Sequence, residues 1–349
     1  MTIKDIAKKA GVSTATVSYV INGTKNVLPE KRQRVLDVIA KTGYQPNQVA
    51  KSLRTRKTSI IGVLVEDIMA FPTSSIINGI SEYMEQTEYN ILLSDLRMMD
   101  SLYNQYDHIV YQQDKINKAI TFLNFGAKVD AIIYVGMFDR DISGVITSMN
   151  KPIVVAYSIS RDDYVCSVTY ENEEISTQLT KHLIDAGHKH IAVITGIAHT
   201  PPAQLRLKGI QKAFKDAGMI LDNALVKNGD WERRTGYACM QELLAQAPLP
   251  TAVIAMNDLM AVGAIDAVRE AGLRVPEDVS VIGFDNREIS EFVYPKLTTA
   301  EIDLKAIGFT AAQVAAQKLS EVGEYAEKRR IIIPCNLIER DTVARLSNT

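Results

Sequence analysis

Cysteines are few in this chain, and long apolar runs are absent. The three cysteines are odd in number, stand far apart and form no CxxC pair; they are Cys166, Cys239 and Cys335. This spacing excludes a disulfide framework and predicts buried, reduced thiols. The longest apolar stretch, near Ala131–Phe138, is far shorter than a membrane span. The charged N-terminus contains no run like that of a signal peptide, so we expect a cytoplasmic protein with no membrane partner.

Closely spaced glycines are missing too. No two of the nineteen glycines are separated by one, three or four residues. This excludes the dinucleotide-binding fingerprint, the nucleophile elbow and the P-loop. His188 and His190 could begin a metal site, but no third ligand is close in sequence, and polar residues at a helix-to-strand junction explain the pair more simply. We therefore expect no enzyme: no catalytic residue, no metal and no cofactor.

Acidic residues are scarce at one end of the chain. Residues 1–58 contain twelve Lys or Arg against three Asp or Glu, a net charge of +9, whereas the remainder has a net charge of −11. A basic end on an acidic body predicts that contact with nucleic acid is confined to the first 58 residues.

Two short helical patterns meet at a glycine in this basic end. Apolar residues recur at helical spacing in Ile3–Ala10 and again in Thr14–Asn22. Gly11 supplies the left-handed turn position between them, and Ser13 can cap the second helix. This is the helix-turn-helix pattern, whose second helix enters the major groove of DNA.

A third helix completes this headpiece. Pro29 begins the helix at its first turn, and we expect Val35, Leu36 and Ile39 to complete a three-helix core. The helix-turn-helix headpiece then spans residues 1–46, and residues 47–58 form a short basic hinge helix or linker.

Several blocks of the sequence resemble the lactose/galactose repressor (LacI–GalR) family. They are TIKDIAKKAGVSTATVS, GYQPN, AKSLR, AGHKHIAVITG, NDLMAVGAIDAVREAG, VPEDVSVIGFDN and LTT. The resemblance covers essentially the whole chain. It implies a transcriptional repressor that binds palindromic operator DNA as a homodimer, because one headpiece offers too few base contacts for useful specificity.

The expected DNA contacts lie in the second helix and in the hinge. They are Thr14, Ala15, Thr16, Ser18, Tyr19, Asn22, Lys51, Leu53 and Arg54. Many relatives have an arginine where this chain has Tyr19, so operator preference should differ at that base. Thr16 and Ser18 more simply serve phosphates or packing. Leu53 matches the hinge leucine that wedges into the minor groove, and cations surround it.

Beyond residue 58, short runs rich in valine and isoleucine alternate with helix-length amphipathic stretches. The strand-like runs are 59–66, 90–94, 130–136, 152–157, 166–168, 191–196, 226–227, 251–256 and 279–284. The alternation predicts an α/β fold class with parallel sheets covered on both faces, and two sets in succession predict two similar lobes. Ligands bind such sheets beyond the carboxyl ends of the strands.

The resemblance extends to the periplasmic-binding-protein-like fold. It implies a two-lobed effector-binding and dimerisation body, 59–349, in which the chain crosses between lobes near 158–160, 286–290 and 319–323. One lobe would then contain 59–158 and 290–320, and the other 160–288 and 321–340. The tail, 341–349, lacks a leucine heptad, so we expect no tetramerising coiled coil.

Polar and aromatic residues at the predicted strand ends are candidates for ligand binding. Of Asn257 and Asp258, one should cap the following helix and leave the other free for the ligand. Asp285 ends a buried run, where an acceptor can hold a pair of hydroxyls. Arg206 is either a surface helix residue or a fork for two hydroxyls. Trp231, the only tryptophan, either packs in its loop or stacks on the apolar face of a sugar ring.

The resemblance favours ligand binding for four of these residues. In sugar-responsive members of the family, the blocks matching PAQLRLKG, GDW, ND and GFDN carry a sugar-binding arginine, a stacking tryptophan and hydroxyl acceptors. The chain departs from those members elsewhere in the pocket, where it has two tyrosines, Pro202 and the turn Met69–Pro72. The expected effector-binding residues are Phe71, Tyr134, Tyr157, Arg206, Trp231, Asn257 and Asp285.

These observations predict a sequence-specific repressor of a carbohydrate-utilisation operon. A small saccharide, with a galactoside as the first candidate, should release it from its operator. The alternative is a corepressor-type regulator, in which a ligand or a partner protein tightens DNA binding. A sugar-transport protein is disfavoured by the headpiece and by the missing signal peptide.

Overall fold

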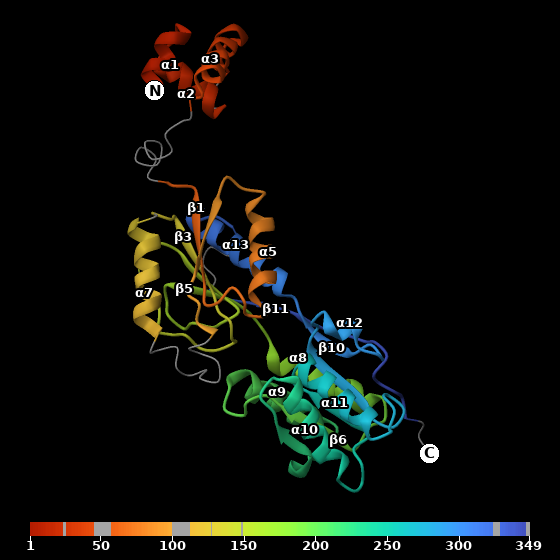
Figure 1. Ribbon diagram of the computed structural model, residues 1–349. Helices are drawn as coiled ribbons and strands as arrows, with labels where there is room; N and C mark the ends of the chain where they lie inside the picture. Colours follow the sequence, from red (N-terminus) through yellow and green to blue (C-terminus); the bar gives the residue numbers. More distant parts are fainter. Residues whose placement is uncertain are drawn as a thin grey trace. The chain divides into compact units, whose positions relative to one another are not determined.

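The chain divides after residue 58 into two units, 1–58 and 59–349 (Figure 1). The computed structural model describes residues 1–23, 26–44, 57–99, 112–126, 128–147, 149–323 and 329–346. The expected hinge contacts Lys51, Leu53 and Arg54 lie outside the described residues. Within the described ranges, no helix is both long enough and apolar enough to cross a membrane.

The described residues of the first unit form the helices α1 (Ile3–Ala10), α2 (Thr14–Asn22) and α3 (Pro29–Thr42). The predicted turn is present, because Gly11 ends α1 with φ 64° and the hydroxyl of Ser13 accepts a hydrogen bond of 3.1 Å from the amide of Thr16. The buried core consists of Ile6, Ala7, Ala10, Val17, Val20 and Val35.

One expected core residue of the headpiece is wrong. Leu36 is 41% exposed, whereas its neighbour Val35 is fully buried. Successive residues of a helix point about 100° apart, so Val35 and Leu36 cannot both face α1 and α2 squarely. Ile39 is partly buried against the core, as four-residue spacing from Val35 requires.

The first sheet of the body is parallel throughout, with strand order β11-β5-β4-β3-β1-β2. Its strands are β1 (Ile60–Val65), β2 (Asn90–Asp95), β3 (Ala131–Val135), β4 (Ile153–Ala156), β5 (Val165–Tyr170) and β11 (Arg330–Ile333). One face is covered by α5 (Thr73–Met84) and α13 (Leu304–Ser320). The other face is covered by α7 (Gln113–Thr121), which runs into a π-helical turn, η2 (Phe122–Gly126) (Figure 1).

Side chains of β1 alternate between the two faces of this sheet. Ile61, Val63 and Val65 pack with α5 in one buried cluster, and Leu64 packs with α7 in the other. Both faces of β1 are therefore apolar, which explains why its sequence is a continuous apolar run and not an alternating one.

The second sheet has the strand order β12-β10-β9-β8-β6-β7. Its strands are β6 (Ile191–Thr195), β7 (Val226–Asn228), β8 (Ala252–Ala255), β9 (Ser280–Asp285), β10 (Thr298–Ile302) and β12 (Cys335–Ile338). Every pair is parallel except β10 with β12, which is antiparallel.

Four longer helices and two short ones accompany this second sheet. They are α8 (Asn172–Asp185), α9 (Pro201–Asp216), α10 (Arg233–Leu244), α11 (Asp258–Glu270), η3 (Asn223–Leu225) and α12 (Ile289–Phe292). Helix α8 packs on α9, and α10 packs on α11. Right-handed crossovers place these two pairs on opposite faces of the sheet.

The predicted crossings between the lobes are wrong in all three places. Strand β5 ends at Tyr170 in the first sheet and α8 begins two residues later beside the second. The other crossings lie at Asp303, between β10 and α13, and at Pro334, between β11 and β12. Lobe 1 is therefore 59–170 with 304–333, and lobe 2 is 172–302 with 335–346. Sequence periodicity identifies a strand but not its sheet, because strand pairing is non-local.

Candidate functional site

A cleft of about 440 Å³ lies between the two lobes, at the carboxyl ends of their strands. The lobe-1 wall is mostly apolar or aromatic and includes Phe71 and Tyr157. The lobe-2 wall carries most of the polar groups, among them Arg206, Asn257 and Asp285, together with Trp231. The volume and the mixture of apolar wall and few polar groups are typical of a small-molecule site.

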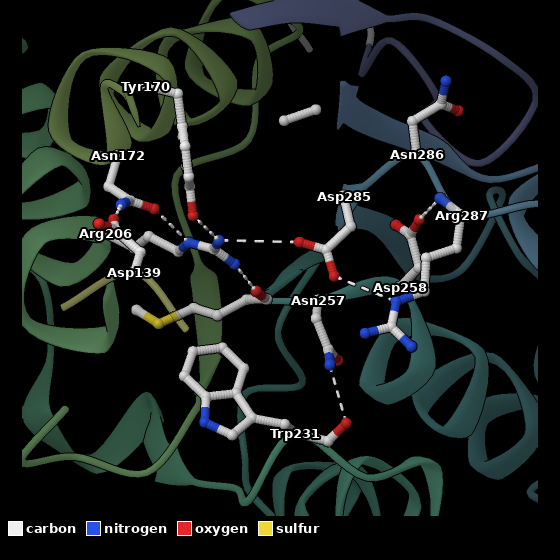
Figure 2. Close-up of polar contacts among 12 residues, drawn as sticks. Asp139, Tyr170, Asn172, Arg206, Trp231, Asn257, Asp258, Asp285, Asn286 and Arg287 are labelled. Carbon is white, nitrogen blue, oxygen red and sulfur yellow. Dashed lines mark hydrogen bonds and ion pairs between the residues drawn. The ribbon is translucent and has the colours of Figure 1, made fainter. Parts of the chain in front are cut away.

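Arg206 on α9 is held at this cleft by contacts from both lobes (Figure 2). Its Nε donates to Oδ1 of Asn172 (2.8 Å), its Nη2 donates to the hydroxyl of Tyr170 (3.3 Å), and its Nη1 donates to the carbonyl of Met256. Its Nη2 also lies 3.7 Å from Oδ1 of Asp285. Because Tyr170 belongs to lobe 1 and the other partners to lobe 2, this guanidinium links the two lobes.

Arg206 keeps its positive charge although its side chain is buried. Burial lowers the pKa of this guanidinium, but the combined effects of Tyr170, Asp285 and Tyr157 leave it above its usual value. The guanidinium carbon also lies 3.5 Å from the ring centroid of Phe284 and 5.6 Å from that of Trp231. A rigid, charged fork is therefore presented at the cleft wall.

Trp231 reaches the cleft from the loop before α10. Its backbone has φ 76°, and its carbonyl accepts a hydrogen bond of 2.8 Å from Nδ2 of Asn257. The indole packs directly over Gly196, where a methyl group would overlap the ring. The aromatic face is therefore held in position by residues of two other loops.

At the start of α11, Asn257 and Asp258 do not divide the helix cap and the cleft-facing position between them as expected. Oδ1 of Asn257 caps α11 by accepting from the amide of Met260 (2.9 Å), and Asn257 also lines the cleft. Asp258 is fully buried and accepts from the hydroxyl of Thr299 and the amide of Arg287, each at 2.6 Å. Asn257 therefore both caps the helix and faces the cleft, whereas Asp258 is buried and is not one of the residues lining the cleft.

Asp285 and Arg287 form the far end of the polar wall. Nε of Arg287 lies 3.3 Å from Oδ2 of Asp285 (Figure 2). The guanidinium carbon of Arg287 lies 3.9 Å from the ring centroid of Phe71. Burial raises the pKa of the Asp285 carboxyl, while Arg206 and Arg287 lower it. Phe71 belongs to lobe 1, so Arg287 makes a second contact between the lobes.

Tyr134, expected in the cleft, lies elsewhere. It is fully buried with the side chains that pack under α7, and its hydroxyl donates to Oε1 of Glu66 (2.5 Å). Glu66 is fully buried as well and pairs with Arg140 at 2.7 Å. As the fourth residue of β3, Tyr134 points into the core below the sheet and is not one of the residues lining the cleft.

The other six expected residues line the cleft: Phe71, Tyr157, Arg206, Trp231, Asn257 and Asp285. Sequence reasoning missed Asp139, Tyr170 and Arg287, which line it too. Tyr170 stacks on Tyr157 with 5.5 Å between ring centroids. Strand-end position could have suggested Tyr170, but nothing in the local sequence marks Asp139 or Arg287.

The headpiece exposes part of its expected DNA surface. Thr14 and Ala15 are exposed at the start of α2, and Ser18 and Tyr19 are half-buried. The hydroxyl of Thr16 lies 2.9 Å from that of Ser13, so it already belongs to the helix cap. The side chain of Asn22 lies outside the described residues.

Both histidines of the pair have hydrogen-bond partners within the protein, and the ring of His190 contacts the carbonyl of Pro248. The ring of His188 contacts the hydroxyl of Thr251 and the carbonyl of Ala344, each at 3.0 Å, and burial lowers its pKa. Among the residues that the structure describes, no three His, Cys, Asp or Glu side chains are placed to hold a metal ion.

Comparisons with known proteins match both units. Residues 2–47 match the model of bacterial regulatory proteins of the lacI family, and residues 180–343 match that of the periplasmic binding protein-like domain. The chain is 33% identical to catabolite control protein A of Priestia megaterium over 92% of this chain and 93% of the relative. It is 35% identical to the HTH-type transcriptional repressor PurR of Pasteurella multocida (strain Pm70) over 93% of each.

Solved structures agree with these relatives. The chain is similar to the lac repressor dimer bound to operator and the anti-inducer ONPF, with a TM-score of 0.78, 26% identity and 99% of each chain covered. It is also similar to the transcriptional regulator CelR in complex with cellobiose, with a TM-score of 0.62, 27% identity and 98% and 99% covered.

A helix-turn-helix headpiece followed by a two-lobed body of this fold defines a DNA-binding transcriptional regulator, not an enzyme. The chain belongs to the LacI–GalR family of bacterial transcriptional repressors.

Proposed function

We propose that this repressor controls a carbohydrate-utilisation operon and that a small saccharide, bound in the cleft between the lobes, releases it from its operator. The observation that carries the proposal is the pairing of aromatic faces with hydroxyl partners in one cleft. Trp231 offers a ring face, and Arg206 and Asp285 stand beside it. Sugar rings have apolar C–H faces and a rim of hydroxyls, so they need both kinds of group.

One solved structure supports a sugar as ligand, because the similar transcriptional regulator CelR was solved in complex with cellobiose. A galactoside is the first sugar to test, because Arg206, Trp231, Asn257 and Asp285 match the sugar-binding blocks of the family and line the cleft together.

The operator contacts are proposed for α2 and the hinge. Thr14 and Ala15 are exposed where the recognition helix would meet base edges, with Tyr19 one turn later. Leu53 of the hinge would wedge into the minor groove, and the cations Lys51 and Arg54 beside it would contact phosphates. One headpiece makes few base contacts, so we propose a homodimer on a palindromic operator, as in the lac repressor dimer bound to its operator.

Release follows from linkage between the two sites. The lobes contact each other across the cleft through Arg206 with Tyr170 and through Arg287 with Phe71. A sugar that contacts both walls favours one arrangement of the lobes. If DNA favours the other arrangement, sugar binding lowers operator affinity by the same coupling free energy, about 1–3 kcal/mol in typical cases.

Emission from Trp231 tests this function, since the chain has no other tryptophan. Galactosides should change the emission saturably, and gel-shift titration should show operator release at the same sugar concentrations. Adenine and guanine serve as flat ligands without a rim of hydroxyls. If purines shift the emission and no sugar does, the saccharide proposal fails. If sugar tightens operator binding, the protein is of the corepressor type.

A further inference from the structure

Asp139 has a buried carboxyl in the wall of the cleft, and only one of its two oxygens accepts a hydrogen bond from a described residue. It lies in the loop after β3, lines the cleft and is 5% exposed. Its Oδ2 accepts from Nδ2 of Asn172, and Oδ1 of the same asparagine accepts from Nε of Arg206 (Figure 2). No described residue donates a hydrogen bond to Oδ1 of Asp139.

This carboxyl differs from the rest of the lobe-1 wall. The other lobe-1 residues that line the cleft, such as Phe71, Met137 and Tyr157, are uncharged. The two arginines of the cleft both pair with Asp285, on lobe 2. Among the described residues, no cation is in direct contact with Asp139, which is linked to Arg206 through Asn172. Its unused oxygen is therefore an acceptor that a ligand can satisfy.

The charge balance of the cleft limits which ligands suit it. Its described lining contains four carboxylates, Asp139, Asp230, Glu232 and Asp285, against two arginines, Arg206 and Arg287. A phosphate or carboxylate placed near Asp139 would meet like charge in a site of low dielectric, which costs several kcal/mol. A hydroxyl donates to the carboxylate and adds no charge.

We propose that Asp139 is a specificity-determining residue, whose Oδ1 accepts a hydrogen bond from a sugar hydroxyl and thereby selects uncharged sugars over phosphorylated ones. The proposal rests on the proposed function, because it assigns one contact of the same ligand. It also gives the sugar a polar contact on each lobe: Asp139 on lobe 1, and Arg206 with Asp285 on lobe 2.

The test compares a neutral galactoside with its 6-phosphate in the full-length chain, by Trp231 emission and by calorimetry. The wild type should bind the neutral sugar and discriminate against the phosphate. In D139N, an amide replaces the carboxylate, so the affinity for the neutral sugar should fall by about tenfold to a hundredfold. The penalty on the phosphate should shrink, and the ratio of the two affinities should move towards one.

D141N is the matched control, because Asp141 lies in the same loop but is exposed and does not line the cleft. It changes the net charge by the same amount and should leave the ratio unchanged. Circular dichroism establishes that each variant is folded.

Three results would overturn the proposal, and each would have a different meaning. If the wild type binds no sugar, the proposed function fails and this contact fails with it. If the wild type prefers the phosphorylated sugar, the function survives but the selection by Asp139 does not. If D139N weakens both sugars equally, Asp139 only positions Asn172 and Arg206.

Discussion

Trp231 owes its position to two residues that do not stack on a ligand themselves. Gly196 leaves room for the indole, and Asn257 donates to the carbonyl of Trp231. Asn257 is fixed in turn, because its Oδ1 caps α11. Trp231 is therefore a proposed ligand contact, and its emission also reports whether Gly196 and Asn257 still hold the indole in position.

Gly196→Ala should displace the indole and weaken sugar binding. Gly196 does not have a positive φ, so alanine fits its backbone and only the added methyl group matters. Overpacking of this kind costs about 1–3 kcal/mol, shared between stability and ligand affinity. Emission spectra without ligand should already differ from the wild type. Gly218→Ala is the control, since Gly218 has φ 68° and open space around it and should change stability alone.

Asn257→Asp separates the two roles of this side chain. Aspartate caps a helix as well as asparagine, so α11 should stay capped. The donor to the Trp231 carbonyl is lost, and we expect sugar affinity to fall by about two- to tenfold, the net worth of one hydrogen bond. Calorimetry measures this. Asn257→Ala loses the cap as well, so its melting temperature should fall further; equal melting temperatures for the two variants would contradict the division of roles.

The residues of the cleft were predictable where a strand end or a family block marks them. Arg206, Trp231, Asn257 and Asp285 are of this kind. Tyr134 also lies near a strand end, but the two-residue alternation of β3 points it into the core. Asp139 and Arg287 follow strand ends by a few residues in loops whose path is set by tertiary contacts. Their presence in the cleft could not be read from local sequence.

At the scale of elements, glycines let α5 and α13 cross at close range. A methyl group at Gly79 would overlap the carbonyl of Lys305, and one at Gly308 would overlap the carbonyl of Ile76. Beside the crossing, Tyr83 and Phe309 meet edge to face, with 5.1 Å between ring centroids. Both helices cover the same face of the first sheet, so the distance between them determines how closely they pack on each other and on that sheet.

Gly308→Ala should destabilise lobe 1, because backbone atoms cannot move aside as a flexible side chain can. We expect a loss of about 1–3 kcal/mol in the free energy of unfolding, measured by urea denaturation. Gln313→Ala lies on the same helix at a half-buried position and should change stability by less than about 0.5 kcal/mol. A Gly308→Ala protein as stable as the wild type would mean that the helices can separate without cost.

The strands that were predicted are those with dense apolar runs, such as β1, β3, β6 and β9. The three that were missed, β10, β11 and β12, lie late in the chain. Strand β10 is largely buried but contains two threonines and a glutamate, and β11 and β12 are only partly buried, so none shows a dense apolar run typical of a buried strand. Strand β11 pairs with β5 and β12 pairs with β10, so each completes a sheet begun much earlier in the sequence. Such pairings depend on the assembled fold, which is why the crossings were misplaced.

At the scale of the whole molecule, buried carboxyls make the stability of this body depend on pH. Burial raises the pKa of Asp258 to about 7, and the nearby charge of Asp285 adds to the shift. Burial likewise raises the pKa of Asp139 to about 6, against the opposing effect of Arg206. In the unfolded chain both groups return to the ordinary aspartate value near 4. Between about pH 4 and pH 7 these two carboxyls therefore bind more protons in the folded protein than in the unfolded chain.

The sign of the effect follows from linkage: stability falls with rising pH wherever the folded state binds more protons. We expect the free energy of unfolding to fall as pH rises from 5 to 8. Asp258→Asn should reduce this fall by about 3 kcal/mol, because the folded pKa lies about two units above pH 5 and each unit corresponds to about 1.36 kcal/mol. The asparagine still accepts from the amide of Arg287, and the hydroxyl of Thr299 can turn to accept from its amide group. Urea denaturation at several pH values checks the slope. Asp278→Asn is the control, because Arg274 lowers the pKa of that exposed carboxyl and its titration lies below this window. Parallel profiles for the wild type and Asp258→Asn would show that Asp258 is ionised throughout, and that its contacts with Thr299 and Arg287 outweigh its burial.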